Sequence, residues 1–147
     1  MELAEEPAGW TLPISGYSVY QIEFGGRVAV CASGKREGEE RFAPLVDLIF
    51  NSRFSLQEPS GKSYELDAEG PWDLLAALFA LRHCRISGGV ATRDGSIFVE
   101  FEEGFQLSAG SGERYENWEV VGPRGLKLVG LPGGGEPAIW DGKTDPK

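Results

Sequence analysis

The sequence is poor in the residues from which most metal and nucleophilic sites are built. It contains one histidine, His83, and two cysteines, Cys31 and Cys84. A site with two histidine ligands is therefore excluded, and neighbouring residues on a helix point about 100° apart, so His83 and Cys84 could not easily share a metal ion. We expect no metal, no cofactor and no catalytic group, and reduced thiols unless the fold brings the two cysteines together.

Positive charge and long apolar runs are also scarce. The chain has 14 Lys and Arg residues against 23 Asp and Glu residues, for a net charge of −9. This balance argues against nucleic-acid binding, which needs clustered positive charge. No apolar run approaches the roughly 18 residues that span a bilayer, and residues 1–16 lack the basic start and apolar stretch of a secretion signal. The sequence predicts a cytoplasmic protein without nucleic-acid or membrane partners.

Glycine and proline punctuate a series of short alternating segments. Residues 17–24 and 27–31 alternate on either side of Gly25-Gly26, which is a recognised signal for a β-hairpin. A second hairpin is predicted from residues 90–92 and 97–102 around the turn at 93–96. Further strands are predicted at 45–50, 53–57, 63–66, 105–107, 118–121, 126–129 and 138–140.

One segment carries the helical period instead. Pro71 suits a first helical position, and leucines recur at helical spacing at positions 74, 75, 78 and 81. We therefore predict a helix over 71–83. Together these patterns predict an α+β fold, a predominantly antiparallel sheet of hairpins with one main central helix. We expect a single domain at 9–140, with flexible tails at 1–8 and 141–147.

The last third of the chain has a distinctive set of short motifs. They are Tyr115-Glu116-Asn117-Trp118-Glu119, Gly122-Pro123-Arg124-Gly125-Leu126 and Pro132-Gly133-Gly134. In these motifs the chain resembles a small family of uncharacterised bacterial domains found chiefly in actinomycetes. The resemblance implies a compact α+β protein of the cytoplasm without an assigned activity, and it supplies no catalytic residue.

The residues leave two readings of function open. Glu100 and Glu102 share one strand face and could support acid/base chemistry or bind a cation, although carboxylates on a sheet face are more often simply solvated. With His83, they define the alternative of a small-ligand-binding protein or minor enzyme with a pocket between sheet and helix. A Cys31–His83 pair would need tertiary contact, and no serine lies in a nucleophile elbow.

The favoured reading starts from charge and aromatic residues in one stretch. From 97 to 119 there are six acidic residues against Arg114 alone, with aromatic residues interleaved. Such a composition suits the binding of a basic protein, because aromatic side chains anchor interfaces and carboxylates steer the encounter. We therefore predict a non-enzymatic interaction module, immunity-like or regulatory by analogy with small acidic inhibitors. Its predicted partner-binding residues are Glu100, Glu102, Glu113, Tyr115, Glu116, Trp118 and Glu119.

Overall fold

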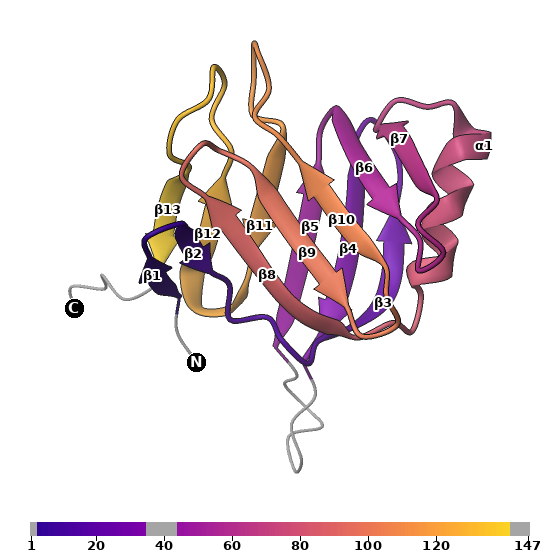
Figure 1. The fold of residues 1–147 in the computed structure, drawn as a ribbon, viewed down its shortest axis with the longest axis horizontal. Coiled ribbons are helices and arrows are strands. Elements are labelled where there is room, and N and C mark those ends of the chain that lie inside the picture. Colours follow the sequence, from indigo (N-terminus) through magenta and orange to yellow (C-terminus); the bar gives the residue numbers. More distant parts are fainter. Residues whose placement is uncertain (1–2, 35–43, 142–147) are drawn as a thin grey trace.

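Two antiparallel sheets face each other across one hydrophobic core (Figure 1). The structure is a computed structural model that describes residues 3–34 and 44–141. The first sheet has the strand order β1 (Ala4–Glu6), β2 (Gly9–Thr11), β8 (Ile86–Thr92), β9 (Ile97–Phe101), β10 (Gln106–Ala109), β6 (Arg53–Gln57) and β7 (Ser63–Asp67). The second has the order β13 (Ala138–Asp141), β12 (Leu126–Val129), β11 (Trp118–Val121), β5 (Leu45–Phe50), β4 (Val28–Ser33) and β3 (Ser18–Glu23).

The α+β prediction is wrong, because the fold is mainly β. The predicted helix exists, but it consists of α1 (Trp72–Leu75) and the 3-10 helix η1 (Ala76–Leu81). It stands at one end of the molecule beside β7 and β3, and does not form a layer over a sheet (Figure 1). The reason is that each sheet buries its main apolar face against the other sheet, so no helix layer is needed to cover it.

Most predicted strands are confirmed, because a strand with one buried face must alternate apolar and polar residues. In β9, Ile97, Val99 and Phe101 are buried, while Phe98 and Glu100 between them face outward. The hairpin predicted around Gly25-Gly26 is β3–β4, in which a bulge shifts the register after Val19.

The structure adds two strands at the N-terminus. β1 pairs with β2, and β2 pairs in turn with β8, so this hairpin extends the first sheet at its edge. β1 lies within the segment 1–8 that the sequence assigned to a tail. Residues 142–147 of the predicted C-terminal tail lie outside the described residues. In the part of the chain that the structure describes, no helix has the length and apolar character to cross a membrane.

Candidate functional site

Three connections gather at one end of the sandwich, and we call this region the loop end (Figure 1). They are the β8–β9 turn at 93–96, the β10–β11 loop at 110–117 and the β12–β13 loop at 130–137. Gly133 donates its N–H to the carbonyl oxygen of Gly112 at 2.8 Å, which joins the second loop to the third. A Cβ on Gly95 would lie 2.8 Å from the Gly135 oxygen, so the turn and the third loop are also in close contact. The loop end is therefore one packed unit.

Trp118 supports the loop end from inside. Its side chain is fully buried, at 0% exposure, and its Nε1–H donates to the carbonyl oxygen of Gly95 at 2.8 Å. A Cβ on Gly130 would lie 2.3 Å from the same nitrogen, so glycine is needed for the indole to fit. Trp118 was predicted as a surface anchor, and its burial removes it from any contact surface. A large aromatic ring at the start of a strand fills the core when the facing sheet covers it.

Asn117 closes the base of the 110–117 loop. Among the residues that the structure describes, it is a buried polar side chain, at 4% exposure. Its Nδ2 donates to the carbonyl oxygens of Gly110 and Arg53, each at 2.8 Å. Its Oδ1 accepts from the backbone N–H of Ser52 at 3.1 Å and from the Ser52 hydroxyl. One side chain therefore fixes both ends of the loop to β6. No pattern in the sequence pointed to this role.

Tyr115 lies outside this support. Its side chain is 60% exposed, and Glu113, Arg114 and Glu116 around it are exposed as well. The Glu116 carbonyl oxygen accepts from Asn51 Nδ2 at 3.2 Å, which holds the backbone next to Tyr115. The loop thus presents one aromatic ring between Arg114 and Glu116, with Glu113 close in sequence, on a backbone anchored at several points.

The remaining predicted binding residues are dispersed. Glu100 lies on the outer face of the first sheet, and Glu102 lies in the β9–β10 turn, at the opposite end of β10 from the 110–117 loop. Glu119 lies on β11 in the second sheet, where it accepts from Asn51 at 3.3 Å and approaches Lys127 at 4.0 Å. Chain reversals between strands separate residues that are close in sequence, so the predicted face is reduced to Glu113, Tyr115 and Glu116.

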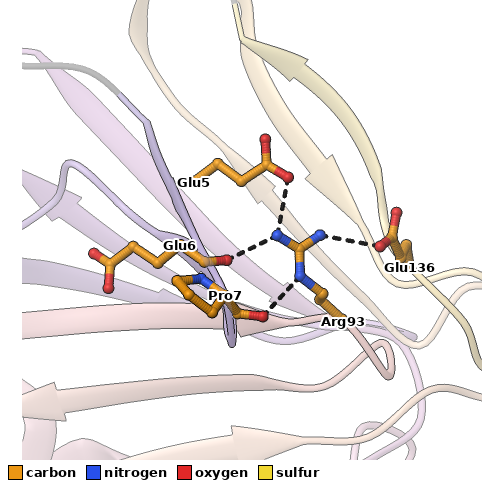
Figure 2. Close-up of polar contacts among 5 residues, drawn as sticks. All are labelled: Glu5, Glu6, Pro7, Arg93 and Glu136. Atoms are coloured by element: carbon orange, nitrogen blue, oxygen red, sulfur yellow. Dashed lines mark hydrogen bonds and ion pairs between the residues drawn. The ribbon is translucent and has the colours of Figure 1, made fainter.

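Arg93 connects the loop end to the N-terminal hairpin (Figure 2). Its guanidinium lies 4.7 Å from the centre of the Trp10 ring. It donates to four oxygen atoms, which are Glu5 Oε2 at 2.9 Å, Glu136 Oε2 at 3.0 Å and the carbonyl oxygens of Glu6 at 2.8 Å and Pro7 at 2.9 Å. The pKa of Arg93 is raised, mainly by the hydrogen bond to Glu5 and next by the hydrogen bond to Glu136. We call this group the arginine clasp, and its partners indicate a structural role.

The two cysteines lie in different surroundings and are free. Cys31 belongs to a small apolar cluster on β4 and β5 that is separate from the main core, whereas Cys84 joins the main core. The pKa of Cys31 is raised to about 12, mainly by burial and next by a hydrogen bond to Asp47. Burial also raises the pKa of Cys84, whose Sγ–H donates to the Ala80 carbonyl oxygen at 3.4 Å. Both thiols are therefore protonated at neutral pH and are poor nucleophiles.

The other candidates for chemistry lie apart from one another. His83 is exposed, has φ of 72° and donates its backbone N–H to the Val19 carbonyl oxygen. Glu100 faces outward, while Leu75, Leu78 and Leu81 point from the helix into the core. Within residues 3–34 and 44–141, no three His, Cys, Asp or Glu side chains are grouped so that they could hold a metal ion.

Comparison with known proteins gives one match. The model of a family described as a family of unknown function, DUF6188, matches residues 10–141. Neither a curated protein nor a solved structure matches the chain.

Proposed function

The chain belongs to the DUF6188 family, and we propose that it is a non-enzymatic protein-interaction module, immunity-like or regulatory, that binds a basic protein through its loop end. The observation that carries the proposal is Tyr115, which is 60% exposed on a loop whose base is fixed by buried residues. Binding residues are commonly found on loops that a rigid scaffold holds in place.

The anchoring of this loop favours binding. A loop that is ordered before contact loses little conformational freedom on association, so more of the contact energy appears as affinity. Asn117 and Trp118 supply this order from below. Tyr115 then offers a large ring with a polar hydroxyl, which is typical of residues that dominate binding energy in interfaces.

The charge of the loop end favours a basic partner. Glu5 and Glu136 share the single positive charge of Arg93 in the arginine clasp, which leaves one negative charge there uncompensated. Glu113 and Glu116 form no ion pair with any residue among 3–34 and 44–141, and the chain as a whole carries a net charge of −9. Such carboxylates attract a positively charged surface and accelerate the encounter, and they give binding that weakens as salt rises.

The test is capture from a lysate of the native cells, with the wild type, Tyr115→Ala and Glu113→Gln/Glu116→Gln each immobilised. Tyr20→Ala is the matched control, because Tyr20 is an exposed tyrosine on β3, in the second sheet. We expect the wild type and the control to retain one basic protein. Once that protein is purified, Tyr115→Ala should weaken its binding at least about tenfold, or about 1.4 kcal/mol.

The carboxylate variant tests the electrostatic part separately. Glu113→Gln/Glu116→Gln should lower the association rate more than it raises the dissociation rate, and should reduce the dependence of the rate on salt. Circular dichroism establishes that each variant is folded. The proposal is wrong if the wild type retains no basic protein above background, or if folded Tyr115→Ala binds it as tightly as the wild type does.

A further inference from the structure

The helical segment at residues 71–81 is apolar on both of its sides. Leu75, Leu78 and Leu81 point into the core, as expected. The same segment leaves two aromatic side chains in contact with water, Trp72 at 61% exposure and Phe79 at 55%. A surface helix normally turns charged residues toward water, and a helix that is apolar all round is normally covered all round.

The exposed apolar surface extends beyond the helix. Phe24, which follows β3, places its ring edge-on to Trp72 and to Phe79, with centroids 5.8 Å apart in both pairs. We call these three rings the aromatic patch. A contiguous exposed apolar surface of this kind marks an interaction site, whereas single exposed apolar residues are common and need no explanation.

The charges around the aromatic patch are arranged by sign along the helix. Asp73 is in the first turn of α1 and is its only charged residue, and Glu69 precedes it. Arg82 lies at the other end, as the C-cap of η1. All three are exposed, and none forms an ion pair with another residue among 3–34 and 44–141. Four α-helical and six 3-10 residues span roughly 18 Å, so the opposite charges are well separated.

This order of charges is self-complementary. When two copies of the helix pack antiparallel, the acidic end of one meets the basic end of the other, and Trp72 of one copy faces Phe79 of its partner. A twofold axis produces this arrangement, because each surface then meets an identical one, and twofold dimers are the commonest oligomers. A wholly basic partner would instead place its positive charge against Arg82.

We propose that the aromatic patch binds a second copy of this chain, in a twofold dimer with antiparallel helices and with Asp73 opposite Arg82. The inference goes beyond the proposed function and does not depend on it. The helix and the loop end occupy different parts of the molecule (Figure 1), so a dimer would leave both copies of Tyr115 open to a partner. The net charge of −9 on each copy opposes association over long range. At 0.15 M salt this repulsion is screened beyond about 8 Å, while the apolar contact is not.

The test is sedimentation equilibrium of the full chain at 0.15 M salt over a range of concentrations. We expect a monomer–dimer equilibrium for the wild type. Trp72→Ser and Phe79→Ser should each raise the dissociation constant at least tenfold. Trp140→Ser is the matched control, because Trp140 is 54% exposed on β13, and it should dimerise as the wild type does.

A charge exchange tests the antiparallel orientation. Asp73→Arg should weaken the dimer, and Asp73→Arg/Arg82→Asp should restore it, because in a twofold contact each copy carries both changes. Tyr115→Ala should dimerise normally, which separates this result from that of the lysate capture. A wild type that stays monomeric overturns the proposal, and so does a folded Trp72→Ser variant that dimerises as the wild type does. If the monomeric wild type captures a different protein through Trp72, the patch has a heterologous partner and the dimer is likewise overturned.

Discussion

The indole of Trp118 donates a hydrogen bond of 2.8 Å to the carbonyl oxygen of Gly95 and so ties the second sheet to a turn of the first. The donor is fully buried, and Gly95 is buried as well. Because both groups are buried, water cannot take the place of this hydrogen bond, and the indole N–H and the Gly95 carbonyl depend on each other as partners. The residue expected to contact a partner instead holds together two of the loops that present Tyr115.

Trp118→Phe should destabilise the protein although it keeps an aromatic ring. The variant leaves the Gly95 carbonyl oxygen without its donor, and a buried group deprived of its partner costs about 1–3 kcal/mol. Urea unfolding followed by circular dichroism measures the change. Trp140→Phe is the control and should lie within about 0.5 kcal/mol of the wild type, because its ring is largely exposed. Equal stability of the two variants would show that the hydrogen bond contributes nothing.

Asn117→Ala should be more damaging than a typical surface substitution. It removes the donors to Gly110 and Arg53 and the acceptor for Ser52 together, so we expect a loss of about 3 kcal/mol in urea unfolding. Ser52→Ala removes one of these contacts and should cost about 1 kcal/mol. If Asn117→Ala costs no more than Ser52→Ala, the asparagine does not act as the closure of the loop.

Arg93→Lys should loosen β1 selectively. Lysine keeps the positive charge but lacks the planar set of donors that reaches Glu5, Glu6, Pro7 and Glu136 at once. Amide hydrogen exchange should become at least tenfold faster in β1 and change little in β9, at the centre of the same sheet. Arg114→Lys, on an exposed loop residue, is the control and should leave the exchange of β1 unaltered. Unchanged exchange in Arg93→Lys would contradict the role of the arginine clasp.

Alkaline pH should destabilise the protein in part through Cys31. Folding raises the pKa of this thiol from an ordinary value of 9.0 to about 12, so the folded state holds the proton more tightly than the unfolded state does. The resulting stability is complete below about pH 9 and is lost as the pH rises toward 12. Cys84 and Tyr20 have raised pKa values too and act in the same direction.

The contribution of Cys31 is measured as a difference between two proteins. The urea midpoint should fall between about pH 7 and about pH 10 in the wild type, and should fall less in Cys31→Ala. Cys31 should also resist alkylation in the folded protein at neutral pH, because the thiolate is the reactive form. Rapid alkylation of native Cys31, or identical pH dependence in the two proteins, would argue against a raised pKa.

The strands were predictable from the sequence because alternation is a local property. Ile97, Val99 and Phe101 reveal a buried face whatever covers it. Which element covers that face depends on contacts between residues far apart in the sequence, and the local pattern does not contain this information. A second sheet was therefore mistaken for a helix layer. The leucine spacing located the helical segment correctly, but it could not distinguish an α-helix from a short α-turn followed by a 3-10 helix.

The candidate sites were predictable only in part for the same reason. Tyr115 and Trp118 are three residues apart, yet one is exposed and the other fills the core, since Tyr115 lies in a loop and β11 begins at Trp118. Phe24 and Phe79 come together only in the folded chain. A run of acidic residues in the sequence likewise does not form one surface, because the turns between strands place its members on different sheets and at different ends of the molecule.

The arginine clasp also bears on how the chain folds during synthesis. The contact between Glu5 and Arg93 can form only after Arg93 is synthesised, 88 residues later. The contact between Arg93 and Glu136 needs a further 43 residues. Contacts across such distances close slowly, because much of the chain must be ordered before they form. β1 is thus synthesised well before the residues that secure it, and its acidic, exposed residues keep it soluble in the meantime.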